Sequence, residues 1–356
     1  MMRSTFENYQ RVYEMLEDEE SRDVYLNRLN YLISGNGRYV RNMVAASIKT
    51  GSTYGIGREV TTLRNTIPQD KRIVLYGAGS FGEYMLPYWE EDKRFSGFCC
   101  RTKEKQANGY LGYPAISPEE LLTRRDLAVV ISTTTFRDEI LQILREGNYP
   151  ENLIFEIPEF EVTDDPGQYF NPAFMKYEDG EVFVDAGCFN LSTSLELRNY
   201  CKHIEKIYAF EPDAQNYQNC VKRKTETNLF QANILPFGTW SEETMLHFQA
   251  KGNGSSCIDM DGNLDIPVMP IDSVVDAAER VTMIKMDVEG AELESLKGAR
   301  ETILRNRPKL AICIYHKPED MTEIPLYIKS LVPEYKFFVR HHSNYFAETV
   351  LYAIVQ

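Results

Sequence analysis

Hydrophobic and polar positions along the chain predict a helical N-terminal segment followed by two series of strands and helices. Over residues 4–34, apolar side chains recur at helical spacing, which predicts amphipathic helices. Gly35-Asn36-Gly37 ends this pattern, and a loop rich in Gly, Thr and Ser follows at 50–57. We therefore expect residues 1–70 to form a helical segment of their own.

The first series of strands and helices covers residues 71–158. Its apolar runs lie at 72–76, 95–98, 127–131 and 153–157, with helical patterns around 81–91, 117–124 and 136–146. Strands that alternate with helices predict βαβ units on a parallel sheet. We expect a Rossmann-like domain here, followed by a linker at 159–172 that is rich in acidic residues, Pro and Gly.

The second series covers residues 173–356. Its expected strands are 182–185, 207–210, two short runs within 228–250, 283–286, 310–314, 335–339 and 349–355. The polar loop between the last two is too short for a crossover helix, so these strands must pair antiparallel. The predicted fold class is α/β with two Rossmann-like doubly wound domains. We expect the C-terminal domain to have the architecture of class I S-adenosylmethionine methyltransferases, a parallel sheet that ends in an antiparallel hairpin.

The first series carries a glycine-rich turn directly after its first strand. Gly77, Gly79 and Gly82 have the spacing of the dinucleotide fingerprint, whose glycines let the backbone approach a phosphate. The next strand, however, ends in Cys99-Cys100-Arg101 instead of the acid that binds a ribose, and Pro87 interrupts the helix. Arg101 could meet a 2′-phosphate instead. Two interpretations stay open: a nucleotide site, or a tight strand-to-helix turn.

The second series places carboxylates at two consecutive strand ends. Asp185 opens a loop containing Gly187, Asn190 and Ser192, and Glu211-Pro212 follows the next strand. A carboxylate repels phosphate but suits a cationic ligand without phosphate, such as S-adenosylmethionine. Glu211 could accept both ribose hydroxyls, and Pro212 would fix the turn that orients it. The alternative is that the two acids cap the helices that follow them.

Several motifs of the second series resemble the FkbM family of S-adenosylmethionine-dependent methyltransferases over residues 180–356. They are Val182-Phe-Val-Asp-Ala-Gly187, Tyr208-Ala-Phe-Glu-Pro-Asp213, Ile271-Asp-Ser-Val274, Ile284-Lys-Met-Asp-Val-Glu-Gly-Ala-Glu292 and Ile314-Tyr-His316. The resemblance implies that Trp240, Ser241 and Gly254-Ser255-Ser256 lie near the adenine or in a loop over the site. Cys188-Phe189-Asn190-Leu191 departs from the family's Asn-x-Gly. Residues 72–157 resemble the Rossmann-like domain of sugar-modifying and capsular polysaccharide proteins.

Candidate catalytic residues follow the expected strands at 283–286 and 310–314. Lys285, Asp287 and Glu289 alternate at one strand end, and His316 ends the next. Asp287, Glu289 or His316 could take a proton from the acceptor, and Lys285 could hold their charge or stabilise a developing oxyanion. The alternative is a salt-bridged strand end. Nothing in the pattern fixes the oxygen ligands that Mg²⁺ needs, so we expect no metal.

Charge and cysteine content narrow the function classes. The chain has 39 basic and 53 acidic residues, a net charge of −14, which argues against a surface for nucleic acid or an anionic membrane. Its start lacks an apolar signal region, and no apolar run approaches the ~18 residues of a membrane span. The seven scattered cysteines fit free thiols in a reducing compartment. We expect a cytoplasmic protein that can form homo-oligomers.

The function expected from these observations is methyl transfer from S-adenosylmethionine to oxygen. The resemblance implies a small-molecule or glycan acceptor: a sugar, a glycolipid or another polyhydroxylated metabolite. The alternative is that residues 71–158 carry the activity as an NAD(P)- or nucleotide-sugar-dependent enzyme, or act as a binding module for such a ligand.

Overall fold

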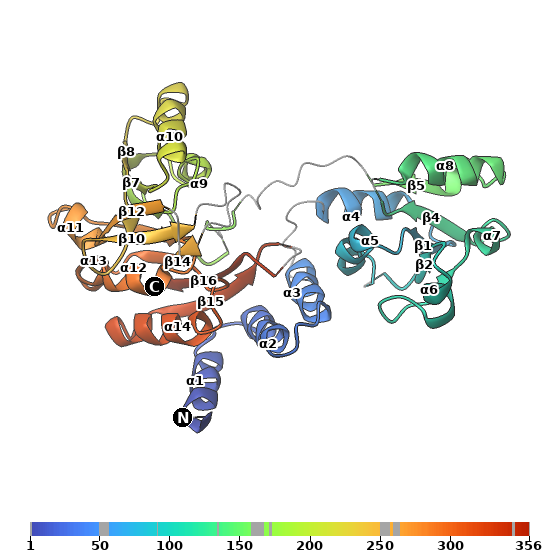
Figure 1. Ribbon diagram of the computed structural model, residues 1–356, viewed down its shortest axis with the longest axis horizontal. Coiled ribbons are helices and arrows are strands. Elements are labelled where there is room, and N and C mark those ends of the chain that lie inside the picture. The colour runs from blue at the N-terminus through green and yellow to red at the C-terminus, as the bar shows by residue number, and fades with distance from the viewer. Residues whose placement is uncertain are drawn as a thin grey trace. The chain divides into compact units, whose positions relative to one another are not determined.

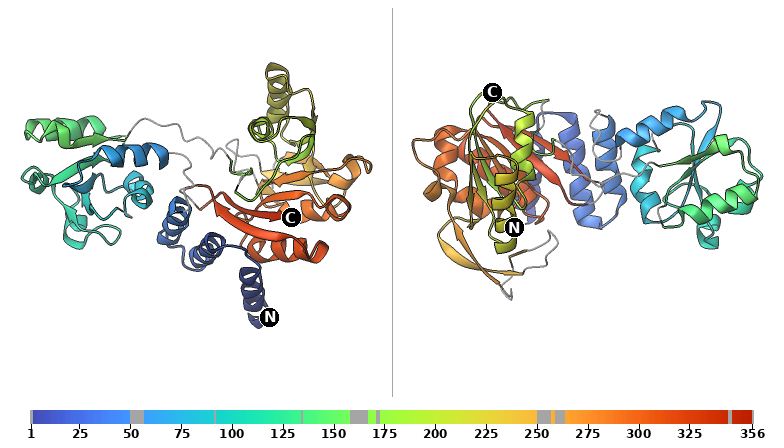
Figure 2. Two further views of the ribbon diagram at one scale, coloured as in Figure 1. Left: turned by 180° about the vertical axis from the view of Figure 1, so that it is seen from behind. Right: turned by 90° about the horizontal axis from the view of Figure 1, so that it is seen from above.

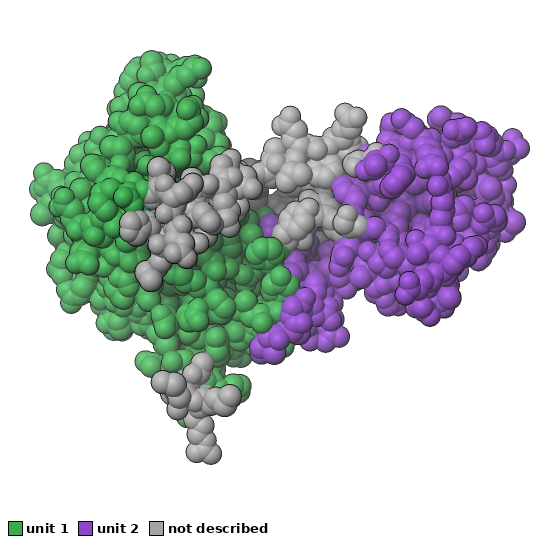
Figure 3. Space-filling view, viewed as in Figure 1, with its two compact units in different colours: residues 1–32, 166–342, 346–356 green, residues 33–165, 343–345 purple. Residues whose placement is uncertain are grey.

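A computed structural model describes residues 2–49, 57–90, 92–133, 135–157, 167–170, 173–249, 257–258, 264–343 and 346–355. The chain divides into two compact units (Figure 3). Unit 1 comprises residues 1–32, 166–342 and 346–356, and unit 2 comprises residues 33–165 and 343–345. The N-terminal helices are therefore shared between the units. Most of the expected linker at 159–172 lies outside the described residues.

Unit 2 is a Rossmann-like layer of five parallel strands in the order β3-β2-β1-β4-β5. Its helices are α3 (Arg38–Lys49), α4 (Gly57–Thr66), α5 (Ser80–Met85), η1 (Leu86–Tyr88), α6 (Lys103–Asn108), α7 (Pro118–Leu121), α8 (Arg137–Glu146) and η2 (Glu151–Leu153). Its strands are β1 (Arg72–Tyr76), β2 (Phe95–Cys99), β3 (Ala115–Ile116), β4 (Leu127–Ile131) and β5 (Ile154–Glu156).

Both faces of the unit 2 sheet are covered by helices, as Figure 2 shows. Ile73 and Leu75 of β1 pack in one cluster with side chains of α3, α4 and α5, whereas Val74 and Tyr76 pack in another with side chains of α7 and α8. Successive side chains of a strand point to opposite faces, so a strand covered on both sides is apolar throughout. This explains why β1 and β4 are continuous apolar runs in the sequence.

Unit 1 is built on a seven-stranded sheet in the order β15-β16-β14-β13-β6-β7-β8 (Figure 1). Its strands are β6 (Glu181–Ala186), β7 (Ile204–Phe210), β8 (Ala232–Leu235), β13 (Met283–Met286), β14 (Lys309–Cys313), β15 (Lys336–His341) and β16 (Thr349–Ile354). Its helices are α1 (Met2–Glu14), α2 (Glu19–Ser34), α9 (Ser192–Glu196), η3 (Leu197–Asn199), α10 (Ala214–Glu226), α11 (Ile271–Val274), α12 (Glu292–Lys297), α13 (Arg300–Asn306) and α14 (Asp320–Leu331).

This sheet confirms the predicted fold class. Strands β8, β7, β6, β13 and β14 pair in parallel, and β16 pairs antiparallel with both β14 and β15. The antiparallel hairpin is therefore present where the short polar loop required it. The order reverses between β6 and β13, and an open α/β sheet binds its ligand outside the strand ends at such a reversal.

The N-terminal segment covers the edge of this sheet. Leu16 forms a parallel bridge with Phe337 of β15, and the amide of Glu17 donates to the carbonyl of Phe337. Arg340 of β15 pairs with Asp18 at 2.6 Å and with Glu20 at 3.1 Å. An edge strand exposes unpaired backbone groups, so this contact protects β15 from pairing with another chain.

A second, four-stranded sheet in unit 1 was not predicted as a sheet. It pairs β11 (Cys257–Ile258), β10 (Thr244–Gln249), β12 (Leu264–Met269) and β9 (Gly238–Thr239) in that order. The sequence predicted two short strands within 228–250 but no strand at the positions of β11 and β12. The run of β12 contains Pro267, which argues against a strand, and β9 and β11 have two residues each. No helix among the described residues has the length and apolar character to cross a membrane.

Candidate active site

The ends of five strands of unit 1 meet at one edge of the seven-stranded sheet. The parallel strands β6, β7, β13 and β14 all end there, and the antiparallel strand β16 begins there, since Cys313 pairs with Val350. Asp185, Glu211, Asp287 and His316 lie at or just beyond these ends. The structure thus gathers at one edge the residues that were expected to serve cofactor and acceptor.

Gly187 lets the loop after β6 lie directly against the loop after β13. Its φ is +76°, and a Cβ at this position would overlap the carbonyl oxygen of Asp287. The loop also holds Phe189 and Leu191 at φ values of 50° and 65°, a region that non-glycine residues rarely adopt. Backbone strain of this kind persists where surrounding structure enforces it, often at ligand sites.

Asp185 is fully buried beneath this loop. Its Oδ1 lies 3.2 Å from the ammonium of Lys285, and its Oδ2 accepts from the Ser194 hydroxyl at 2.6 Å. Lys285 in turn donates to the carbonyl oxygen of Gly187 at 2.6 Å. The structure therefore gives Asp185 and Lys285 contacts that support the loop from within. Direct contact of Asp185 with a cofactor stays a prediction.

Glu211 presents a second carboxylate beside the same loop. It is 5% exposed, and its Oε1 accepts from the amide of Asp213 at 2.9 Å. Burial raises the pKa of Glu211 to about 7, which the hydrogen bonds from the backbone of Asp213 and Phe189 only partly offset. No ion pair to Glu211 occurs among the described residues, so its charge is available to a ligand. Asp213, not Glu211, caps α10 through bonds to the amides of Gln215 and Asn216.

The other predicted cofactor residues have structural contacts of their own. The side chain of Asn190 accepts from the amide of Ser192 at 2.9 Å, and Arg223 of α10 donates to the carbonyl of Asn190. Trp240 is half-buried after β9, and the following Ser241 donates to Glu294 at 2.7 Å. Gly254-Ser255-Ser256 lies outside the described residues. Cofactor contacts of Pro212, Asn190, Ser192 and Trp240 stay predictions.

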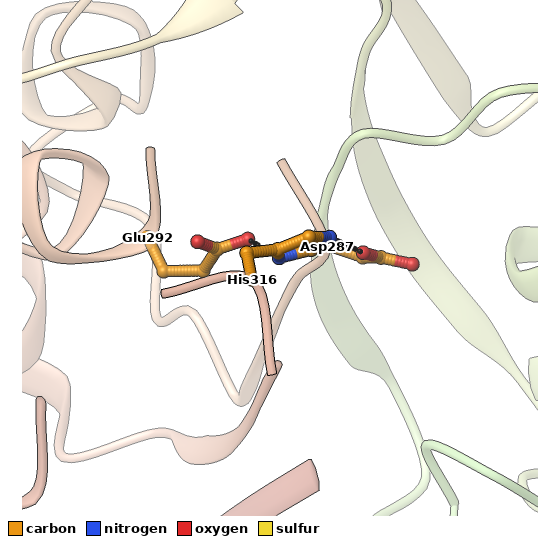
Figure 4. Close-up of side chains that lie close together, drawn as sticks. All are labelled: Asp287, Glu292 and His316. Atoms are coloured by element: carbon orange, nitrogen blue, oxygen red, sulfur yellow. Dashed lines mark ion pairs between the residues drawn. The ribbon is translucent and has the colours of Figure 1, made fainter. Parts of the chain in front are cut away.

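Three carboxylates, two after β13 and one at the start of α12, surround the imidazole of His316, and Figure 4 shows two of them. Nδ1 of His316 lies 2.9 Å from Glu292, and Nε2 lies 3.4 Å from Glu289 and 3.6 Å from Asp287. Asp287 and Glu289 keep 24% and 30% of their side chains exposed, whereas Glu292 is fully buried. Glu292 also accepts from the amide of Val288. The predicted catalytic side chains therefore form one cluster that opens toward solvent at Asp287 and Glu289.

These carboxylates change the chemistry expected of His316. Burial lowers its pKa, but Glu289 and Glu292 outweigh burial and raise the pKa to about 11. A protonated imidazole cannot accept a proton, so these carboxylates argue against His316 as the general base, and its catalytic role stays a prediction. For Asp287, burial favours a higher pKa, but Lys285, His316 and the Tyr169 hydroxyl bring the pKa below its ordinary value.

Four residues of the cluster were not expected from the sequence. The hydroxyl of Tyr169 donates to Asp287 at 2.9 Å. The hydroxyl of Tyr315 lies 3.2 Å from Asp287 Oδ1 and 3.3 Å from Glu348 Oε1, and Gln168 donates to Glu348. Tyr169 and Gln168 come from the segment before β6, which carries no strand signal. Glu348 directly precedes a predicted strand whose antiparallel direction puts its start at this edge, and that signal could have found it.

Two groups of side chains in the described residues could hold a metal ion: Asp287, Glu292 and His316, and Asp287, Cys313 and Glu348. In the first group the imidazole contacts Glu292 through Nδ1 and Asp287 through Nε2, so the ring lies between the carboxylates (Figure 4). That is the arrangement of an ion-paired imidazolium, because ligands of one metal must converge on a single point. The absence of a metal from this site stays a prediction.

The glycine turn of unit 2 shows three different environments. A Cβ at Gly77, whose φ is +135°, would overlap the carbonyl of Ser132, and a Cβ at Gly82 would overlap the carbonyl of Gly77. Nothing lies within 4 Å of a Cβ at Gly79. The fold therefore explains two of the glycines, and the third faces open space. Arg101 pairs with Glu139 at 2.7 Å, and both side chains are about half exposed.

A known family model matches the part of the chain that carries most of these site residues. Residues 181–339 match the family model described as the methyltransferase FkbM domain. The match therefore lies within unit 1. The matched segment runs from β6 into β15 and includes Glu211, Asp287, Glu289 and His316. The expected FkbM resemblance is confirmed for these residues, whereas the sugar-type Rossmann domain expected at 71–158 stays a prediction.

Several solved structures are similar to the chain, and their names describe methyltransferases. FkbM from Methylobacillus flagellatus KT is 22% identical, with 87% of this chain and 96% of that chain covered and a TM-score of 0.46. An rRNA methylase from Streptococcus thermophilus is 17% identical, covering 50% and 89%, with a TM-score of 0.33. The N-terminal domain of human METTL16, solved with SAH, is 11% identical, covering 54% and 67%, with a TM-score of 0.33. No curated protein matches the chain.

Proposed function

We propose that the FkbM domain transfers a methyl group from S-adenosylmethionine to a hydroxyl group of a sugar or another polyhydroxylated molecule. The observation that carries this proposal is that the candidate cofactor residues and the candidate acceptor residues of the matched segment lie at one edge of the sheet. Glu211 and the loop after β6 lie at the same sheet edge as the cluster around Asp287. A transferase needs the donor and the acceptor side by side, because in-line displacement depends on their alignment.

The residues present fit the cofactor at its ribose. Glu211 offers a buried carboxylate without a cationic partner among the described residues, which suits the two hydroxyls of a ribose as donors. Asp185 and Lys285 hold the loop from 187 to 191, whose backbone would face the methionine end. S-adenosylmethionine supplies, when bound, a methyl group on a positively charged sulfur. The negative charge at this edge favours that ligand over a nucleotide phosphate.

The cluster around Asp287 would bind and orient the acceptor. Asp287 and Glu289 are partly exposed carboxylates, so they can accept hydrogen bonds from neighbouring hydroxyl groups. Three carboxylates surround the single positive charge of His316, those of Asp287, Glu289 and Glu292. This excess of negative charge would repel phosphate or carboxylate groups on the acceptor. We therefore propose that the acceptor is neutral or cationic near the reacting hydroxyl.

A methyl-transfer assay tests this proposal. Labelled S-adenosylmethionine is incubated with a panel of methyl glycosides, inositols and the corresponding sugar phosphates. We expect transfer to neutral hydroxylated compounds and little to the phosphates. Asp287→Asn should lower kcat far more than it weakens S-adenosylhomocysteine binding, while Glu211→Ala should do the reverse. Wild type that methylates only phosphorylated compounds, or none, would argue against the proposal.

A second candidate function belongs to unit 2. The open space at Gly79, beside two glycines that packing explains, matches the division of roles in the dinucleotide fingerprint. We propose on this ground that unit 2 binds a nucleotide, either NAD(P) or a nucleotide sugar. No acid follows β2 to bind a ribose diol, since the strand ends in Cys99 before Cys100 and Arg101. Such a site would therefore use Arg101 on a phosphate.

A further inference from the structure

We propose that Glu348 takes the proton of the acceptor hydroxyl, acting as one half of a carboxylate pair in which Asp287 is the other half and Tyr315 supplies the bridging proton. This inference rests on the proposed function and assigns a proton acceptor to the same site. Glu348 lies outside the matched family segment, in the turn that leads into β16.

Asp287 and Glu348 compete for the same hydrogen-bond donor. The phenol of Tyr315 has one proton but lies 3.2 Å from Asp287 and 3.3 Å from Glu348. Asp287 receives a second donor, the hydroxyl of Tyr169, and has cationic neighbours in Lys285 and His316. Glu348 receives Gln168 and a share of Tyr315, with no ion pair among the described residues. Of the two carboxylates, Glu348 is therefore the one that gains more from a proton.

The other candidates in the cluster are less suited to accept a proton. Asp287 is stabilised as an anion, and His316 is already protonated. Glu289 lies 3.4 Å from the imidazolium and is partly neutralised by it. Like charges in one site push one pKa upward, and burial together with Asp287 raises the pKa of Glu348 to about 7. A base works best when its pKa lies near the working pH.

The groups that face Glu348 come from every element around it. They are Asp287 after β13, Cys313, Tyr315 and His316 at the end of β14, and Gln168 and Tyr169 from the segment before β6. The backbone of Glu348 has a φ of 65°, so the turn holds it in a conformation that is costly for a side chain. Arg28 of α2 fixes the same turn by donating to the carbonyl of Phe346. The position of Glu348 is thus enforced from two sides.

The proposed step balances in atoms and charge. The acceptor's O–H bond breaks, and its proton passes to the carboxylate of Glu348. The acceptor oxygen forms a bond to the methyl carbon while the bond from that carbon to sulfur breaks, and its electron pair stays on sulfur. The products are the methyl ether, neutral S-adenosylhomocysteine and protonated Glu348, which releases its proton to water.

The first test needs no acceptor. Wild type and variants labelled with ¹³C at the glutamate carboxyl are titrated by NMR in the presence of S-adenosylhomocysteine. We expect one resonance with a midpoint near 7 to disappear in Glu348→Gln. Asp287→Asn should lower that midpoint, because it removes the like charge, and Tyr315→Phe should raise it, because it removes a donor. Glu211, identified through Glu211→Gln, serves as the control that neither change should shift.

The second test uses the methyl glycoside that wild type modifies best. Glu348→Gln should reduce kcat by roughly 10²-fold or more while S-adenosylhomocysteine binds as before. Tyr315→Phe should move the acidic limb of the kcat–pH profile upward. Active wild type with an equally active Glu348→Gln variant, or a Glu348 resonance that titrates in the ordinary range, would overturn the inference alone. Wild type that neither binds S-adenosylhomocysteine nor transfers methyl would instead overturn the proposed function.

Discussion

Some side chains at the strand ends stabilise the loops of the site, whereas others are left without a partner that could offset their charge. Asp185 and Lys285 neutralise each other in the interior and hold the loop that contains Gly187. Glu211 has no such partner among the described residues, although it is almost as buried. A buried charge without a partner is costly, and a ligand that supplies donors can offset this cost. Sequence spacing placed both acids correctly at strand ends but could not distinguish their roles.

The first residue-scale prediction concerns Glu211. Its pKa of about 7 in the folded protein means that the carboxylate takes up a proton as the pH falls through 7. The charge that would accept the ribose hydroxyls is then lost, so affinity for S-adenosylhomocysteine should weaken below pH 7. Glu211→Gln should bind roughly 10-fold or more weakly at pH 8 and show little dependence on pH. Calorimetric titrations from pH 5.5 to 8.5 measure both effects.

The same pKa predicts a dependence of stability on pH. The folded-state pKa of Glu211 lies above that of an unfolded glutamate, so folding favours the protonated form. This contribution to the free energy of unfolding is fully present at acidic pH and declines as the pH rises through about 7. Glu211→Gln lacks the ionisation and should lose less stability over that range. Equal pH slopes for binding and unfolding in both proteins would contradict this account of Glu211.

The second residue-scale prediction concerns the close approach at Gly187. Gly187→Ala should lower the free energy of unfolding for two reasons. The φ of +76° is unfavourable for alanine, and the added Cβ would overlap the carbonyl of Asp287. Gly180→Ala is the matched control: its φ is +94°, with nothing within 4 Å of the Cβ. The control should lose about 1–2 kcal/mol from the backbone alone. Gly187→Ala should lose roughly 1–3 kcal/mol more.

Urea unfolding of the two variants measures this difference, and titration with S-adenosylhomocysteine shows its effect on the site. We expect Gly187→Ala to bind more weakly even where it remains folded, because the loop must move away from β13. Equal losses of stability in the two alanine variants would mean that the loops after β6 and β13 are not in close contact.

At the scale of elements, α2 connects the N-terminal segment to the candidate site. Arg28 is 1% exposed and donates to the carbonyl of Tyr315 at 3.0 Å as well as to that of Phe346. These two carbonyls lie in the turns that carry His316 and Glu348. The helix therefore fixes both turns from behind. Periodicity predicts that a helix exists here but carries no information on which sheet edge it contacts.

The prediction at this scale is that Arg28→Met destabilises unit 1. It leaves two partly buried carbonyl groups without their donor, which should lower the free energy of unfolding by roughly 1–3 kcal/mol. Arg198 provides a matched control, because it also donates to two backbone carbonyls, of Thr227 and Asn228, but at an exposed position. Arg198→Met should change stability by no more than about 0.5 kcal/mol. Similar effects of both substitutions in thermal and urea unfolding would contradict the proposal that Arg28 stabilises the two turns.

Some elements could be read from the sequence and others could not. The strand expected at 283–286 coincides with β13 because three of its four residues are apolar and buried, as is typical of a central parallel strand. The hairpin of β15 and β16 followed from the length of its loop. The sheet of β9 to β12 was missed because its strands are short, or contain proline, and pair across gaps in the sequence. Tyr169 reaches the site from a loop, where no periodic signal exists, whereas the direction of the strand after Glu348 could have placed that residue at the site.

At the scale of the whole molecule, the two units carry different side chains at the strand ends of their parallel strands. The edge of unit 1 carries unpaired or clustered carboxylates, and the turn of unit 2 carries glycines with a nearby arginine. Negative charge favours a cationic ligand, whereas a glycine turn with a basic side chain favours a phosphate. The two units should therefore discriminate between S-adenosylhomocysteine and nucleotide diphosphates, and they should do so independently.

The most direct test of the central claim is calorimetric titration of the full-length protein with S-adenosylhomocysteine, NADH and a UDP-sugar, repeated with Glu211→Ala. We predict that wild type binds S-adenosylhomocysteine at one site and that Glu211→Ala loses most of this affinity. Binding of a nucleotide to unit 2 should be the same in both proteins. Binding of NADH or the UDP-sugar without any binding of S-adenosylhomocysteine would contradict the account.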